Sequence, residues 1–141
     1  ESWRHGRIDR RRERRDSAEL MRRFDVKARA PDVPIRSLSG GNQQKAIMAR
    51  WLQRLPRVLL LDEPSQGVDA IARAEIHQLI RDHVALGNAV LVVSSDDAEL
   101  AGLCDRVVIL QSGRRIAELS GTALTADRIT YLTQFEPQES S

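Results

Sequence analysis

The run of four apolar residues from Val58 to Leu61 constrains the fold of this chain more than any other feature. Its side chains do not alternate with polar ones, which predicts a strand buried on both faces, as in a parallel sheet. A second apolar run, "AVLVV", occupies residues 89–93. The segment between them predicts an amphipathic helix with Gly87 as its cap. Its inward residues are expected to be Ile71, Ile76, Leu79, Ile80 and Val84.

Further elements alternate in the same way along the chain. Helices are predicted over residues 16–24, 41–54 and 96–104, with Ser39 as a cap before the second, and a loop at Pro31 and Pro34. A strand is expected at residues 106–110, a returning strand at 113–119, and a last helix from Thr125. The alternation predicts an α/β fold, a mostly parallel sheet flanked by helices.

Composition excludes several classes of protein. The 141 residues suffice for about one domain, no apolar run approaches the length of a transmembrane helix, and the single Cys104 excludes an internal disulfide. Residues 1–29 hold 11 Lys and Arg against 6 Asp and Glu, and the remaining residues hold 11 against 14. A basic segment can bind nucleic acid or anionic lipid. Its interleaved acids favour local ion pairs instead, so no nucleic-acid partner is expected.

The stretch "LSGGNQQK", residues 38–45, is the first candidate site. The N-terminus of a helix presents unpaired N–H groups and the positive end of a dipole, so it can hold an anion. Ser39, Gly40 and Gly41 are therefore predicted to form a phosphate-contacting turn, because glycine lets the backbone approach a phosphate closely. The alternative is an ordinary capped helix, with Asn42 to Lys45 on its solvated face.

The stretch "LLLDEP" is the second candidate site. It places Asp62 and Glu63 at the carboxyl end of a strand, where ligands bind in open α/β sheets. Asp62 suits Mg²⁺, which takes one or two carboxylates with phosphate oxygens and water. Glu63 is suited to polarise water that attacks a phosphate. The alternative is a pair of acids in a loop without a catalytic role.

Together and in this order, these motifs resemble those of an ATP-binding cassette (ABC) ATPase. "LSGGNQQK" matches the signature sequence, "VLLLDEP" the Walker B motif, and "SQGVD" at residues 65–69 the D-loop. The longer pattern "GGNQQK…AR…DEPxxGVD" resembles that of carbohydrate importers of the ribose, galactose and xylose type, whose ATPase subunits carry two cassettes on one chain. The stretch "SSDDAEL…CDRVVIL" is similar to the second cassette of those subunits. The resemblance covers about residues 20–134. It implies a P-loop NTPase-like fold and the cofactors ATP and Mg²⁺.

The resemblance also implies a role for each residue of the signature. Ser39, Gly40 and Gly41 would meet the γ-phosphate of an ATP held by the opposite cassette, and Asn42 and Gln43 would flank that contact. The glycines would thus act on a nucleotide bound by a partner.

Roles at the strand end follow from the same resemblance. Asp62 would reach Mg²⁺ through water, Glu63 would position the attacking water, and Asp69 would communicate across the cassette interface. Alignment on Glu99 places Ser95 where most active cassettes carry a histidine. A hydroxyl lacks positive charge and stabilises developing negative charge less well. This site is therefore expected to be slow, or only to bind nucleotide.

One motif of the family is absent. The chain contains no G-x-x-x-x-G-K-[ST], the Walker A loop that cradles phosphates. We therefore expect a partial cassette without its Walker A half, inactive as a fragment alone. Residues 1–36 would be the end of the helical subdomain and a basic, partly flexible connector. Residues 37–141 would be the C-terminal part of the ATPase domain.

The resemblance implies part of an ATP-hydrolysing subunit of a sugar importer, cytoplasmic and peripheral on the inner face of the cell membrane. Its partners would be a second cassette (in the same chain or a homodimer), transmembrane permease subunits and, indirectly, a sugar-binding protein. A non-catalytic regulatory cassette is one alternative. A DNA-repair or chromosome-organising ATPase is another, disfavoured because residues 1–24 lack sustained heptads.

Overall fold

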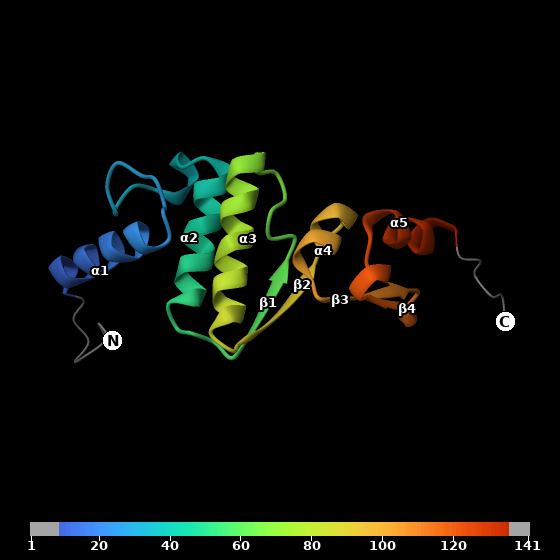
Figure 1. The fold of residues 1–141 in the computed structure, drawn as a ribbon. Coiled ribbons are helices and arrows are strands. Elements are labelled where there is room, and N and C mark those ends of the chain that lie inside the picture. Colours follow the sequence, from blue (N-terminus) through green and yellow to red (C-terminus); the bar gives the residue numbers. More distant parts are fainter. Residues whose placement is uncertain (1–8, 136–141) are drawn as a thin grey trace. The chain divides into compact units, whose positions relative to one another are not determined.

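The computed structural model describes residues 9–135, in which helices alternate with strands from α2 (Gly40–Leu52) to β3 (Arg106–Gln111) (Figure 1). Short 3-10 turns lie at Ile35–Ser37 and Gly121–Ala123. The helices and strands are α1 (Arg10–Arg23), α2 (Gly40–Leu52), β1 (Val58–Asp62), α3 (Ala70–Ala85), β2 (Ala89–Val93), α4 (Asp97–Leu103), β3 (Arg106–Gln111), β4 (Arg114–Ser120) and α5 (Ala126–Phe135). No helix within the described residues combines the length and apolar character that crossing a membrane requires.

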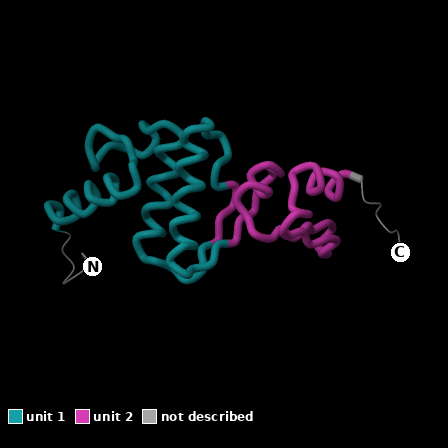
Figure 2. The backbone as a smooth tube through the Cα atoms, viewed as in Figure 1, with its two compact units in different colours: residues 1–59, 64–90 teal, residues 60–63, 91–141 magenta. Residues whose placement is uncertain are grey.

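The chain divides into two compact units (Figure 2). The first comprises residues 1–59 and 64–90, and the second comprises residues 60–63 and 91–141. Both sides of the boundary expected between residues 36 and 37 lie in the first unit, and that division stays a prediction. Residues 1–8 of the expected N-terminal segment lie outside the described part.

In the first unit, α1 begins earlier than predicted, at Arg10 rather than Asp16. The Asp9 side chain accepts hydrogen bonds from the backbone N–H groups of Arg11 (3.0 Å) and Arg12 (3.2 Å), which caps the helix. The prediction followed apolar spacing alone and therefore missed a first turn built from arginine, a good helix former. The helix ends at Arg23, and the C-cap residue Phe24 is buried.

Helices α2 and α3 supply much of the buried surface of the first unit. The prediction for α3 is right at Ile76 and Ile80, which are 0% and 3% exposed, and wrong at Ile71 and Val84, which are 75% and 40% exposed. The buried stripe of α3 consists of Ala72, Ile76, Ile80 and His83, at the three- and four-residue spacing of one helix face. Ile71 stands one residue, or about 100°, away from that stripe. The expected glycine cap is confirmed by Gly87, whose φ is 82°.

Strands β1 and β2 form a parallel pair. The N–H of Ala89 donates to the carbonyl of Arg57 (2.9 Å), and the N–H of Glu63 donates to the carbonyl of Val93 (2.8 Å). Because both partners advance along the chain between these two bonds, the strands run in the same direction. The predicted α/β fold with a parallel sheet is confirmed.

The prediction that β1 is buried on both faces is wrong for the described chain. Leu59 is 7% exposed, whereas Val58 and Leu60 are 60% and 70% exposed. Successive side chains of a strand point to opposite faces, so only the face that includes Leu59 is covered. Strand β2 is likewise exposed at Leu91 and Val93.

The second unit contains an antiparallel hairpin, so the strand expected at residues 106–110 pairs with β4 within the described chain. The returning strand predicted after it is confirmed. The turn residues Ser112 and Gly113 have φ of 50° and 78°, which suits a tight hairpin. Thr125 caps α5 by accepting from the N–H of Arg128 (3.2 Å), as predicted. The core consists of Val107, Ile109, Leu119, Ile129 and Leu132.

Candidate functional site

The turn before α2 places Ser39 at the helix N-cap, as predicted. The Ser39 carbonyl accepts the N–H of Gln43 (2.9 Å), the first backbone bond of the helix. Its hydroxyl does not cap the helix backbone and instead accepts from the side-chain amide of Asn42 (2.8 Å). Ser39 and Gly40 are both exposed, so this turn presents its polar groups at the surface of the first unit.

The two glycines of the turn are required by packing. A Cβ atom at Gly41 would lie 2.4 Å from the Cβ of Ala72, which is a clash, and a Cβ at Gly40 would lie 3.3 Å from the carbonyl oxygen of Gly67. The start of α2 therefore approaches the start of α3 too closely for any other residue at position 41. The prediction explained these glycines by phosphate approach alone and did not foresee this second cause.

Asn42 and Gln43 are not on a solvated helix face. The Asn42 side-chain oxygen accepts the N–H of Lys27 (2.7 Å), and the Gln43 side-chain amide donates to the carbonyl of Leu38 (2.9 Å). Lys45 is only 2% exposed, so the solvated-face alternative is wrong there as well. A stripe of buried residues explains this, because Gly41, Lys45, Met48, Ala49 and Leu52 share one helix face. That spacing is a signal in the sequence from which Lys45 could have been found.

Glu63 follows directly after β1 in a left-handed backbone conformation, with φ of 47°. Such a conformation costs a residue with a side chain roughly 1–2 kcal/mol, and strained residues of this kind cluster at functional sites. One carboxylate oxygen of Glu63 accepts the N–H of Ser95 (2.7 Å), and the other lies 3.5 Å from the hydroxyl of Ser94. Asp62, the last residue of β1, is exposed.

Sequence reasoning missed Ser94, which lies between two carboxylates. Its hydroxyl donates to Glu99 (2.6 Å) and accepts the N–H of Asp96 (3.1 Å). The Asp96 side chain accepts the N–H of Glu99 (2.9 Å) and caps α4. Glu99 is 3% exposed. A polar pair followed by acids after an apolar strand is the signal that could have revealed this cluster.

Ser95 lies beside Glu63, and the contact between them comes from the Ser95 backbone. Any residue except proline can supply that N–H group at position 95, so the bond does not depend on the serine side chain. Asp69, in contrast, acts through its side chain, which accepts the N–H groups of Ile71 (3.0 Å) and Ala72 (2.9 Å) and caps α3. The first unit thus holds Asp69 together with the turn before α2.

The strand-end acids fit a hard cation. In residues 9–135, no group of three or more His, Cys, Asp or Glu side chains is arranged to hold a metal ion. Mg²⁺ does not need such a cage, because it binds through one or two carboxylates together with phosphate oxygens and water. The single exposed carboxylate of Asp62 fits that donor set. Any bound Mg²⁺ at this position would therefore depend on a nucleotide for its other ligands.

Comparisons with known proteins agree on one family. Residues 3–66 match the family model described as ABC transporter. The chain is 46% identical over 127 residues to ribose import ATP-binding protein RbsA 1 of Burkholderia thailandensis, covering 89% of this chain and 25% of that protein. It is 47% identical over 131 residues to a putative ribose/galactose/methyl galactoside import ATP-binding protein 3 of Agrobacterium fabrum, covering 93% and 26%.

Solved structures show the same likeness. The dimeric structure of MJ0796, a bacterial ABC transporter cassette, matches with a TM-score of 0.68 and 27% identity, covering 84% of this chain and 50% of that chain. The post-hydrolysis dimer of MJ0796 bound to ADP and Pi also matches at 0.68, with 26% identity, covering 83% and 50%. This chain spans about a quarter of the length of the curated relatives.

Proposed function

The chain belongs to the ABC transporter family, and we propose that it is part of the ATP-hydrolysing subunit of a sugar importer. The observation that carries the proposal is the glycine turn before α2, which presents Ser39 and Gly40 at the surface while Gly41 is locked against α3. The names of the curated relatives, which are import proteins for ribose and related sugars, support the substrate class.

The signature turn, residues 39–41, acts on the ATP of the opposite cassette. The Ser39 hydroxyl and the unpaired N–H groups of the first turn of α2 donate to the γ-phosphate, and the helix dipole favours the negative charge. Asn42 and Gln43 keep the turn in place through their bonds to Lys27 and Leu38. Asp69, which starts α3, communicates across the cassette interface.

The end of β1 serves the nucleotide of its own cassette. Asp62 would hold Mg²⁺ through water, and the ion would supply positive charge against the phosphates. Glu63 accepts a hydrogen bond from the attacking water and positions it. Its carboxylate is held by the Ser95 N–H (2.7 Å), and position 95 carries a serine where most active cassettes carry a histidine. We infer that this site binds nucleotide and turns over slowly, while Ser39 to Gly41 complete the competent site of the partner.

The cofactors of the assembled protein are ATP and Mg²⁺. Its partners are a second ATP-binding cassette, in the same chain or as a homodimer, together with transmembrane permease subunits and, through them, a sugar-binding protein. The assembly lies on the cytoplasmic, inner face of the cell membrane. A second reading, a non-catalytic regulatory cassette, is favoured by the same serine at position 95.

A calorimetric titration of this chain with Mg-ATP tests the roles proposed for the two sites. We expect no detectable binding into the millimolar range, because no segment of the sequence can cradle the phosphates. A titration with Mg-ADP serves as the matched measurement, since it lacks only the γ-phosphate. Binding of either nucleotide in the low micromolar range would show that another segment replaces the phosphate loop, and the proposed roles would then be wrong.

A further inference from the structure

Lys45 is a buried charge that the proposed chemistry does not use. Its Nζ donates to the backbone carbonyl of Asp25 (2.5 Å) and to the Glu75 carboxylate (2.8 Å), and it lies 3.5 Å from the Asp25 carboxylate. Two of the three donors of the ammonium group are thus hydrogen-bonded, and the Asp25 carboxylate adds an ion pair. A charge that is 2% exposed requires such partners, because an unpaired charge in the interior is very costly.

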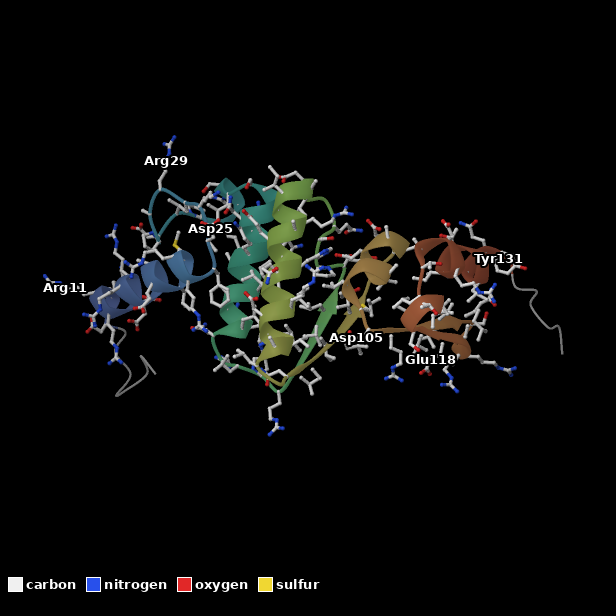
Figure 3. All side chains as sticks on the ribbon, viewed as in Figure 1. Arg11, Asp25, Arg29, Asp105, Glu118 and Tyr131 are labelled. Atoms are coloured by element: carbon white, nitrogen blue, oxygen red, sulfur yellow. The ribbon has the colours of Figure 1, made fainter. Side chains whose placement is uncertain are left out.

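The partners of Lys45 come from segments far apart in the sequence. Asp25 lies in the loop after α1, with φ of 47° (Figure 3). Two residues later, the Lys27 N–H donates to Asn42, so this loop is bonded to α2 both at Asn42 and at Lys45. Glu75 lies on α3, the helix that Asp69 caps. Lys45, on α2, therefore joins this helix both to the loop after α1 and to α3.

The bond from Lys45 to Glu75 is the third in a series of contacts between α2 and residues 67–75, and the series starts at the signature turn. At the turn itself, Gly40 faces the carbonyl of Gly67, and one residue later Gly41 faces Ala72. Lys45 follows Gly41 by one helical turn, and Glu75 follows Ala72 by nearly one turn. The first two contacts are steric and set only how closely the segments approach. The ion pair adds a directional contact that fixes their register along the helix axes.

We propose that Lys45 is a positioning residue that holds the signature turn, residues 39–41, in register with the segment from Gly67 to Glu75. The turn and the D-loop then move as one element when a partner cassette approaches. This inference rests on the proposed function, because it assigns the turn to the partner's ATP. It also makes a statement about the nucleotide-free chain, which can be tested separately.

Hydrogen–deuterium exchange of the nucleotide-free chain is the first test, with Lys45→Met compared to the wild type. We expect exchange at the backbone amides of residues 42–46 and 70–76 to be at least about tenfold faster, because a charged, buried hydrogen bond is lost on each side. The amides of β3 and β4 should be unchanged. Lys27→Met is the matched control, since Lys27 is 72% exposed and lies 3.7 Å from the same Asp25 carboxylate.

Two results would overturn the proposal: no local increase, or an equal increase in β3 and β4, which would mean a general loss of structure. If Lys45→Met does not fold, Glu75→Gln decides, because it removes one charge and keeps an acceptor at that position. A smaller increase confined to the same two segments is then expected, and its absence would refute the role.

A second test uses the assembled ATPase that carries this sequence. Lys45→Met should lower kcat and leave KM for ATP nearly unchanged, since the opposite phosphate loop still binds nucleotide. A merely structural role would instead lower the amount of active enzyme and leave kcat per active site intact, and that outcome would overturn the proposal. If hydrolysis does not depend on Ser39 at all, the proposed function fails, while the exchange data still decide the register between α2 and α3.

Discussion

At the turn before α2 the glycines are fixed by close steric packing, whereas at the end of β1 Glu63 is fixed by hydrogen bonds. Gly41 has no room for a Cβ atom beside Ala72. Glu63, in contrast, is held by an N–H group of Ser95 and lies near the hydroxyl of Ser94. Both regions contain the residues expected to act on ATP, in separate units of the chain.

This difference separates two kinds of constraint. A site fixed by steric contact keeps one geometry and tolerates no added volume. A carboxylate fixed by hydrogen bonds can exchange its partners for water or for a ligand at small net cost, because hydrogen bonds with water replace those with protein. We therefore expect the signature turn to be a preformed surface and Glu63 to be adjustable.

The largest expected effect concerns turnover in the assembled ATPase. Ser39→Ala removes a donor to the γ-phosphate of the competent site and should lower kcat about 100-fold, as the loss of one donor to a developing negative charge does elsewhere. Glu63→Gln should change total turnover far less, because its own site is slow. The measurement is steady-state ATP hydrolysis at saturating nucleotide.

Ser37→Ala is the matched control for the first variant. The Ser37 hydroxyl donates to the carbonyl of Pro34 (2.7 Å) and lies just before the signature turn. It should leave kcat nearly unchanged. A loss with Glu63→Gln as large as that with Ser39→Ala would contradict the proposed asymmetry between the two sites.

The next effect concerns stability. Gly41→Ala should lower the free energy of unfolding by about 1–3 kcal/mol, because the new methyl group forces the starts of α2 and α3 apart. Gly102→Ala is the matched control, since Gly102 lies in a helix and a Cβ there would meet nothing within 4 Å. It should be neutral or stabilising. Urea denaturation followed by circular dichroism measures both.

A second substitution sharpens this result. Ala72→Gly removes the methyl group against which the new side chain would clash, so the double variant should recover part of the stability lost in Gly41→Ala. Gly41→Ala, Ala72→Gly and the double variant form a double-mutant cycle. Each substitution in it also changes helix propensity by about 1 kcal/mol between glycine and alanine, and Gly102→Ala measures that contribution. Additive effects of the two substitutions would mean that the starts of α2 and α3 are not in contact in solution.

The sequence predicted the elements well where a local pattern was complete. The caps at Thr125 and Gly87 and the returning strand β4 all follow from the residue types present. The early start of α1 at Arg10 was missed because its first turn has no apolar residue, and helix formation there depends on the Asp9 cap.

The sequence could not predict what depends on contacts between distant segments. The spacing of the buried stripe places Lys45 on the inner face of α2, but the sequence does not show that Asp25 and Glu75 converge on it. Gly41 reads as a flexible turn residue until Ala72 is found against it. Likewise, an apolar run shows that Leu60 can be buried, yet burial requires a covering element, and the described chain provides none.

A smaller effect on stability is expected at the end of β1. Ser94→Ala removes the hydroxyl that donates to the buried Glu99 (2.6 Å), which should cost about 1–2 kcal/mol. Ser94→Thr keeps the hydroxyl and should restore most of this loss. The Ser95 N–H still reaches Glu63 in both variants, so the fold should persist. A Ser94→Ala chain as stable as the wild type would mean that water replaces the hydroxyl without cost.

The smallest expected effect is a change in the alkylation rate of the Cys104 thiol, which lies in the second unit. Partial burial raises the pKa of its thiol, and the negative charges of Asp105 and Glu99 raise it further. The thiolate is the reactive form, so a raised pKa means slow alkylation at neutral pH and faster alkylation as the pH rises. Asp105, labelled in Figure 3, is the residue that follows Cys104 in the chain. Asp105→Asn removes one negative charge, lowers the pKa of the thiol and should increase the rate of reaction with iodoacetamide at neutral pH.

Gly41→Ala, in the first unit, should leave that rate unchanged, and a change would show that a perturbation of the signature turn reaches the second unit.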